Sequence, residues 1–363
     1  MPTGRQIAGL AGLAALGVAA GLAIEEAVIG RRVRADPNAH EPFGLLHGEP
    51  VEVMSVDGIR LYAEVDEPLD CPYDDGLTLI FSHGYALNQD TWHYQRRDLR
   101  SLGRMVFWDH RAHGKSGRGH PELTTVDQLG LDLGCVVDAL GGRGPVVLVG
   151  HSMGGMTVMA LAAHRPDLFA PIGPVKGVAL LATSAGNMAS STYGLPKVVG
   201  QTAYRLAPEV LTRLTGSADL IDKNRARGSD LAFLLTKYYS FGSNVSPAVT
   251  NFTAEMINGT PIDVVAEFLP GIDAHEKHDA LATMADCESL VMVGDKDRMT
   301  PLAYSNEIVR RMPHSETVLL PDTGHMLMLE RYAEVNHALT DLAARVRRAL
   351  AQDSTDPGAA AVP

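Results

Sequence analysis

Short apolar segments alternate with amphipathic stretches over most of the 363 residues, and this pattern predicts the fold. Segments 51–56 and 59–65 alternate apolar and polar positions on either side of Asp57-Gly58, which is typical of an antiparallel hairpin. Six later runs are apolar without alternation, as in strands buried on both faces of a parallel sheet: 77–82, 105–108, 145–149, 177–181, 290–293 and 317–320. We therefore expect an α/β fold with a mostly parallel, eight-stranded sheet flanked by helices.

A long interruption follows the fourth of these runs, because residues 185–286 contain no comparable strand. Three segments there have helical character: 231–241, 247–258 and 262–268. We expect a helical cap at 185–286, inserted between two parts of one core at 36–184 and 287–350. An amphipathic helix from about residue 333 ends the core. Residues 351–363 are Ala, Gly, Pro and polar, and are expected to form a disordered tail.

Residues 1–35 form a separate N-terminal region. Within it, residues 7–24 carry no charge, and their number is about the minimum that spans a bilayer, although eleven of them are Ala or Gly. Three arginines at 31–34 favour a membrane-associated helix with the rest of the chain on the cytoplasmic side. A helix packed on the surface of a cytoplasmic protein is an equal alternative. A secretory signal peptide with a cleavage site at Gly21-Leu22-Ala23 is less favoured.

Composition and residue spacing argue against nucleic-acid binding, metal sites and a disulfide framework. Hydrophobic residues make up 45% of the chain, enough for a packed core, and the formal net charge of −12 disfavours nucleic acid, whose binding needs clustered Lys and Arg. The three cysteines lie far apart without a CxxC pair, so neither a zinc site nor a disulfide framework is expected: Cys71, Cys135 and Cys287. No metal-ligand spacing or phosphate loop is visible either, and we expect no metal and no cofactor.

The most informative motif is G-x-S-x-G at Gly150-His151-Ser152-Met153-Gly154, directly after an apolar run and before an apolar helix. That context turns the chain sharply and exposes the serine hydroxyl at the carboxyl end of a strand. The two glycines leave room in the turn. The backbone N–H of Met153, at the start of the helix, can then face a developing oxyanion.

This order of motifs resembles the α/β-hydrolase family, in its serine esterase and lipase branch, over residues 51–350. The resemblance implies Ser152 as nucleophile, with the backbone N–H of Tyr85 in His83-Gly84-Tyr85 as the second oxyanion donor. It also implies an acid after the strand that follows the cap. Asp295 and Asp297 compete there, and the family spacing G-x-x-D-x-x-x-P selects Asp297. His325, in the Gly-His pair after the last strand, is the implied general base.

Two further features of the resemblance concern structure rather than chemistry. His83 is expected to fix its loop by hydrogen bonding, and the Tyr85 side chain to narrow or line the acyl pocket. The segment 109–116, Asp-His-Arg-Ala-His-Gly-Lys-Ser, matches a family turn in which Asp109 and Arg111 are expected to lie close together and buttress the loops. His151 and the remaining histidines are expected to be structural or superficial.

The resemblance implies hydrolysis of a carboxylic ester through an acyl-enzyme on Ser152. Apolar clusters in the cap, such as those at 233–235 and 268–269, favour a lipophilic ester or short acylglycerol. Cofactor-free haloperoxidases, thioesterases, carbon–carbon bond hydrolases and acyltransferases share similar triads and remain alternatives, as does a ligand-binding protein without turnover. Epoxide hydrolases and haloalkane dehalogenases are disfavoured, because they have a carboxylate where this chain has Ser152.

Overall fold

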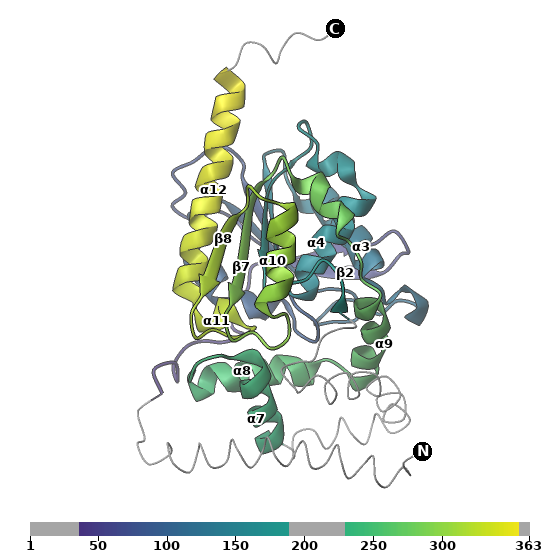
Figure 1. Ribbon diagram of the computed structural model, residues 1–363, viewed down its shortest axis with the longest axis vertical. Helices are drawn as coiled ribbons and strands as arrows, with labels where there is room; N and C mark the ends of the chain where they lie inside the picture. Colours follow the sequence, from purple (N-terminus) through teal and green to yellow (C-terminus); the bar gives the residue numbers. More distant parts are fainter. Residues whose placement is uncertain (1–35, 189–228, 356–363) are drawn as a thin grey trace.

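An eight-stranded sheet forms the centre of the computed structural model, which describes residues 36–188 and 229–355 (Figure 1). Its order is β1-β2-β4-β3-β5-β6-β7-β8, with β1, β2 and β4 paired antiparallel and every other pair parallel. The strands are β1 (Glu49–Met54), β2 (Arg60–Asp66), β3 (Thr78–Ser82), β4 (Arg104–Trp108), β5 (Val146–His151), β6 (Val175–Leu181), β7 (Glu288–Gly294) and β8 (Glu316–Leu320). The predicted mostly parallel α/β sheet is confirmed.

Burial along the strands follows their place in the sheet. Every residue of the central strands β3 and β5 is buried, as their unbroken apolar runs predict. The edge strand β8 differs, because its positions alternate in exposure and Leu319 remains 49% exposed. An apolar run at an edge therefore does not have to be buried on both faces.

Helices cover both faces of the sheet, and each face has its own hydrophobic core. One core joins the sheet to α2, α11 and α12, and the other joins it to α3, α4 and α10. The helices of the core are α2 (His93–Asp98), α3 (Val126–Leu140), α4 (Met153–His164), α10 (Leu302–Arg311), α11 (Leu327–Glu330) and α12 (Tyr332–Thr355), with short 3-10 helices η1 (Gln89–Trp92), η2 (Pro121–Leu123), η3 (Pro166–Phe169) and η5 (Asp279–Met284).

Among the described residues, three further helices lie between β6 and β7 in the chain, at the carboxyl end of the parallel strands (Figure 1). They are α7 (Ser229–Ser240), α8 (Pro247–Gly259) and α9 (Ile262–Asp273). These helices occupy the segments for which the sequence predicts helical character. The limits of the expected cap at 185 and 286 stay predictions, because residues 189–228 lie outside the described part of the chain. We use the name cap helices for α7, α8 and α9.

The structure describes part of the predicted C-terminal tail but none of the N-terminal region at 1–35. Helix α12 continues to Thr355, so residues 351–355 are helical where the sequence predicts a tail. Ala351 and Gln352 have high helix propensity, so the helix continues beyond residue 350, where the apolar pattern ends. Within 36–188 and 229–355, no helix combines the length and apolar character needed to cross a bilayer. The predicted membrane helix at 7–24 lies outside these described residues.

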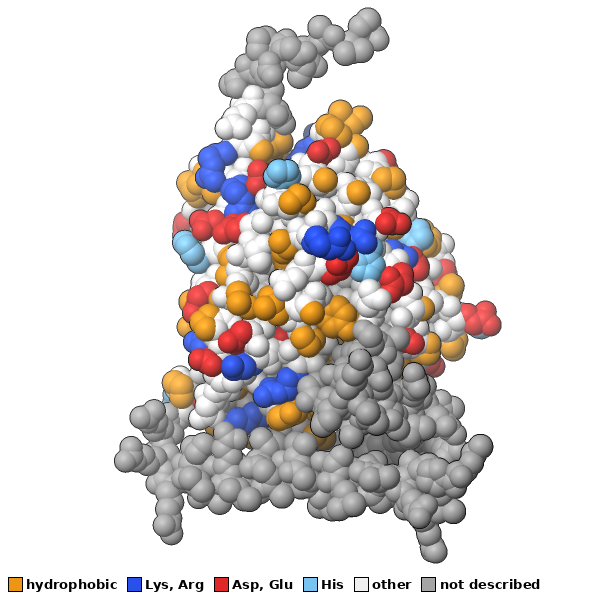
Figure 2. Space-filling model, in the orientation of Figure 1, with side chains coloured by type: hydrophobic (Ala, Val, Ile, Leu, Met, Phe, Trp, Pro, Cys, Tyr) orange, Lys and Arg blue, Asp and Glu red, His pale blue; other side chains and the backbone are white. Residues whose placement is uncertain are grey.

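Surface charges are mixed on the face shown in Figure 2, where acidic and basic side chains lie next to one another. Some arginines are buried instead, among them Arg96 and Arg111. Arg111 is fully buried and donates two hydrogen bonds to each of two carboxylates. Its Nε and Nη2 atoms bind Asp132 at 2.6 and 2.7 Å, and its Nη1 and Nη2 atoms bind Asp57 at 2.9 Å each. Asp109 instead accepts backbone N–H groups of Gln89 and Lys115, both at 2.8 Å. The expected pairing of Asp109 with Arg111 is therefore replaced by two separate arrangements.

Arg111→Met should lower the free energy of unfolding by about 3–5 kcal/mol, because it leaves the buried Asp132 carboxylate without its cationic partner. Urea unfolding at pH 7 measures this loss. The matched control is Arg60→Gln, which breaks an ion pair with Glu52 whose two side chains are half exposed and should cost less than about 1 kcal/mol. Equal losses in the two variants would show that Arg111 does not stabilise the fold by joining the segments of Asp57 and Asp132.

Candidate active site

Ser152 lies in a strained turn between β5 and α4, with φ of 52° and ψ of −119°. Its backbone N–H donates to the Leu181 carbonyl oxygen at 2.9 Å, which ties the turn to β6. The glycines of the motif allow close packing. A Cβ atom on Gly154 would lie 2.1 Å from the Ser82 carbonyl oxygen, and one on Gly150 would lie 2.5 Å from the Gly154 carbonyl oxygen. Neither position accepts a side chain.

Asp297 and His325 lie in contact, although they follow different strands. The His325 Nδ1 atom is 2.9 Å from Asp297 Oδ2. Three further groups donate to the same carboxylate: the backbone N–H groups of Met299 at 2.8 Å and Thr300 at 2.9 Å, and the Thr300 hydroxyl at 2.8 Å. This arrangement selects Asp297 over Asp295 as the partner of His325.

The environment of Asp297 keeps it ionised. Burial acts to raise the pKa of this carboxyl, but His325 and the hydrogen bonds from His325 and Thr300 outweigh burial, so the pKa lies below its ordinary value. An ionised carboxylate can only accept a hydrogen bond. His325 must therefore carry its proton on Nδ1 toward Asp297, which leaves Nε2 available as a base.

His151 connects the loop of His325 to the turn of Ser152. Its Nε2–H donates to the His325 backbone carbonyl at 3.0 Å, and the two imidazole rings are 4.7 Å apart. Burial holds the pKa of His151 well below its ordinary value, so the ring is neutral. Because His151 directly precedes Ser152, this bond brings the predicted base and the predicted nucleophile to the same edge of the sheet.

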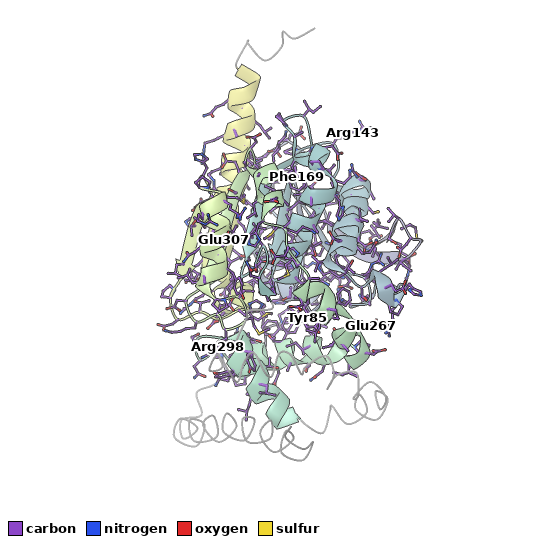
Figure 3. All side chains as sticks on the ribbon, turned by 45° about the vertical axis from the view of Figure 1, so that its right-hand side comes forward. Tyr85, Arg143, Phe169, Glu267, Arg298 and Glu307 are labelled. Atoms are coloured by element: carbon purple, nitrogen blue, oxygen red, sulfur yellow. The ribbon has the colours of Figure 1, made fainter. Side chains whose placement is uncertain are left out.

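Tyr85 follows the end of β3 on the loop that the sequence predicts to form an oxyanion site. Its hydroxyl donates to the backbone carbonyl of Val265 in cap helix α9. Figure 3 labels Tyr85 at the end of the sheet that faces the cap helices. Met153 begins helix α4, where the first backbone N–H groups have no acceptor within the helix. Both predicted donors therefore lie at the same sheet edge as Ser152.

Three buried histidines hold the loops beneath this edge. His83 donates from Nδ1 to the Gly84 carbonyl oxygen at 2.8 Å and accepts the His110 backbone N–H at Nε2 at 3.0 Å. His113 accepts the Ala86 backbone N–H at 3.2 Å, and its Nδ1 lies 3.0 Å from the carbonyl oxygen of residue 111. Burial lowers the pKa of His110 to about 3 and that of His113 to about 4. These neutral rings fix backbone positions, as expected for His83.

Two residues with contacts to the site were not identified from the sequence. Thr300 donates twice to Asp297, and the Asp-x-x-Thr spacing of a side-chain-capped turn could have indicated it. Glu330 binds the backbone N–H of Gly324, next to His325, at 2.7 Å. No local sequence pattern indicates this role of Glu330, because the carboxylate also binds backbone N–H groups of residues 242 and 243, far away in the chain.

Described residues 36–188 and 229–355 contain no group of three or more His, Cys, Asp or Glu side chains able to hold a metal ion. Comparison with known proteins then assigns the family. The alpha/beta hydrolase family model matches residues 79–338. The chain belongs to the alpha/beta hydrolase family. Membership of this family, together with its similar proteins, supports a hydrolase that acts on a small molecule.

Similar proteins of this family include two curated relatives and a solved structure. A RutD protein of Caulobacter sp. strain K31, whose name gives carbamate hydrolysis as a provisional activity, is 28% identical over 75% of this chain and 90% of its own length. A monoacylglycerol lipase of Mycolicibacterium smegmatis is 25% identical over 73% of this chain and 84% of its own. A thermophilic esterase from Thermogutta terrifontis shares the fold with a TM-score of 0.64 and 24% identity, covering 82% of this chain and 99% of its own.

Acid should destabilise the protein through its buried histidines. Burial lowers the pKa of His113 in the folded state, so only the unfolded chain binds a proton at this residue between pH 6.5 and about 4, and stability falls as the pH drops through that window. Between pH 7 and pH 5 the wild type should lose about 2 kcal/mol more unfolding free energy than His113→Gln. Urea titrations at both pH values measure the difference. The other titrating groups are common to both proteins, so parallel losses would contradict a neutral His113.

Proposed function

We propose that this α/β hydrolase cleaves carboxylic esters through an acyl-enzyme on Ser152, with His325 as general base and Asp297 as the carboxylate that orients it. The observation that carries the proposal is the Asp297 to His325 hydrogen bond at the carboxyl edge of the sheet, beside the strained Ser152 turn. Such a constellation activates a serine, because the base removes its proton as the oxygen attacks.

In the proposed reaction, His325 Nε2 accepts the Ser152 proton while the hydroxyl oxygen attacks the ester carbonyl. The imidazolium that forms is stabilised by the ionised Asp297, which also keeps the ring in the required tautomer. His325 then gives the proton to the leaving alcohol. Water, deprotonated by the same imidazole, attacks the acyl-enzyme and releases the acid.

The backbone N–H groups of Tyr85 and Met153 are proposed to bind the oxyanion of the tetrahedral intermediates. Both are backbone donors whose positions are fixed by folded elements, one after β3 and one at the start of α4. Fixed donors stabilise the developing negative charge without reorganising during the reaction. The positive end of the α4 dipole adds to this effect.

Apolar side chains surround the start of α4, directly after Ser152. An apolar cluster joins the start of α4 to cap helix α9, and Tyr85 packs against it: Val126, Leu129, Met153, Met156, Ala160, Met188, Val264, Phe268 and Ile272. The name of the mycolicibacterial relative, a monoacylglycerol lipase, supports the same substrate class. We therefore propose an ester with a medium or long acyl chain, such as a short acylglycerol. Haloperoxidase, thioesterase and carbon–carbon bond hydrolase reactions on the same triad are the alternatives.

Ser152→Ala should lower kcat for p-nitrophenyl esters by a factor on the order of 10³ or more, and Asp297→Asn by about 10³–10⁴, because each removes part of one catalytic unit. Steady-state rates with acetate, butyrate, octanoate and laurate esters measure both the loss and the preferred chain length. Ser315→Ala, which removes a hydroxyl bonded to the Met312 carbonyl oxygen far from the site, is the matched control.

Equal rates for Ser152→Ala and the wild type would reject the proposed nucleophile. Serine-dependent turnover confined to acetate would reject the lipophilic substrate while keeping the mechanism. A wild type that binds these esters without turning them over would favour the ligand-binding alternative.

Tyr85→Phe separates the side chain of Tyr85 from its backbone N–H. The variant keeps the proposed oxyanion donor, so kcat should stay within about threefold of the wild type. It loses the hydrogen bond to Val265 in α9, worth about 0.5–1.5 kcal/mol, so KM for octanoate and laurate should rise about two- to tenfold. Steady-state kinetics with both esters and with acetate measure this. A fall in kcat beyond a hundredfold would instead place the phenol hydroxyl in the chemistry.

A further inference from the structure

Glu330, the last residue of α11, binds three backbone N–H groups from two separate segments. Its Oε2 atom accepts the N–H of Gly324 at 2.7 Å, directly before His325. Its Oε1 atom accepts the N–H of Ser243 at 2.5 Å, and the N–H of Gly242 lies 3.1 Å from both oxygens. Gly242 and Ser243 form the turn that follows cap helix α7. One carboxylate therefore joins the cap segment to the loop of the proposed base.

The backbones of these two segments also pack directly on one another. A Cβ atom on Gly324 would lie 2.5 Å from the Phe241 carbonyl carbon, and one on Gly242 would lie 2.5 Å from the carbonyl carbon of residue 323. The backbone N–H of Met326 donates to the Ser240 carbonyl oxygen at 2.8 Å. Residues 240–243 and 323–326 thus pack main chain against main chain, and neither Gly242 nor Gly324 has space for a side chain.

The loop of the proposed acid contacts the same end of α7. Arg298, which follows Asp297, donates to the Tyr238 carbonyl oxygen at 2.8 Å, and its guanidinium lies 4.3 Å from the centre of the Tyr238 ring. A cation at the last carbonyls of a helix is favourable, because it opposes the negative end of the helix dipole. Figure 3 labels Arg298 at the cap end of the sheet. The neighbours of both Asp297 and His325 are therefore attached to the last turn of α7.

Only a carboxylate satisfies this arrangement of donors. Two acceptor oxygens meet three N–H groups, whereas an amide would offer one oxygen and point its own N–H groups at the remaining donors. None of the ion pairs found among the described residues includes Glu330, so the backbone N–H dipoles stabilise its charge. Charge-assisted bonds of this kind are stronger than neutral ones and fix the groups that they join.

We infer that Glu330 is a positioning residue, which holds the backbone of His325 in place and couples that placement to the seating of cap helix α7. The inference rests on the proposed role of His325. Two other hydrogen bonds hold His325 in place. Asp297 binds its imidazole ring, and His151 binds its backbone carbonyl oxygen. Glu330 supplies the third, at the preceding N–H. Without it, the loop keeps these two attachments and the Met326 to Ser240 bond but loses the carboxylate that joins it to Gly242 and Ser243, and the imidazole samples positions away from Ser152.

Kinetics of Glu330→Ala and Glu330→Gln test this role. Glu330→Ala should lower kcat about 10- to 100-fold with KM within twofold, and Glu330→Gln should fall between it and the wild type because one acceptor oxygen remains. The rate at which a fluorophosphonate labels Ser152 should fall by the same factor as kcat. The control is Glu334→Gln, an exposed carboxylate in the first turn of α12, which should match the wild type.

A rise in KM at constant kcat would overturn the inference, since Glu330 would then act only on the cap and substrate binding. Wild-type kinetics in both Glu330 variants would overturn it as well. Thermal unfolding of each variant is measured alongside, and if Glu330→Ala does not fold, Glu330→Gln decides the outcome.

Proton NMR gives a readout that does not require turnover. The Nδ1–H of His325, bonded to Asp297, should give a far-downfield resonance that disappears in Asp297→Asn. In Glu330→Ala this resonance should broaden or shift, while Glu334→Gln should leave it unchanged. An unchanged resonance in Glu330→Ala would overturn the positioning role. If Ser152→Ala retained full activity, the proposed function would fail separately, and the resonance would still show whether Glu330 positions His325.

Discussion

The parallel pairing of β4, β3, β5, β6, β7 and β8 is the constraint on which the candidate site depends. Parallel strands end at one edge of a sheet, so the loops after β3, β5, β7 and β8 meet there. Tyr85, Ser152, Asp297 and His325 each follow one of these strands. Hydrogen bonds between the strands bring them to a common edge, and the bonds of His325 to Asp297 and His151 act within that arrangement.

At that edge, backbone N–H groups bind several buried or partly buried carboxyl groups. Asp297 and Asp109 each accept two of them, and Glu330 accepts three. Fixed dipoles stabilise a carboxylate at little cost in reorganisation, as the proposed chemistry requires. The strained backbone of Ser152 persists for a related reason, since its N–H and the packing at Gly154 leave the turn no alternative position.

Two of the cap helices, α7 and α9, are attached to the core beside loops that carry the proposed chemistry. Helix α9 is bound by the Tyr85 hydroxyl and by Arg118, whose guanidinium pairs with Asp263 and Glu267 at 2.6 Å each. Helix α7 is bound next to His325 and Asp297. A few short bonds therefore connect the cap to the loops of the proposed base and the proposed oxyanion donor.

The sequence by itself determined the elements and the turn at Ser152. Buried strands show as unbroken apolar runs, and the turn needs its two glycines locally, so both appear in the order of residues. Family spacing also indicated Asp297 and His325. Tertiary structure alone decided the order of β4 and β3, the exposed face of β8, and which carboxylates Arg111 meets. It also decided the three donors of Glu330. These features join residues far apart in the chain, and a local pattern cannot specify them because they depend on how strands pair and where their loops end.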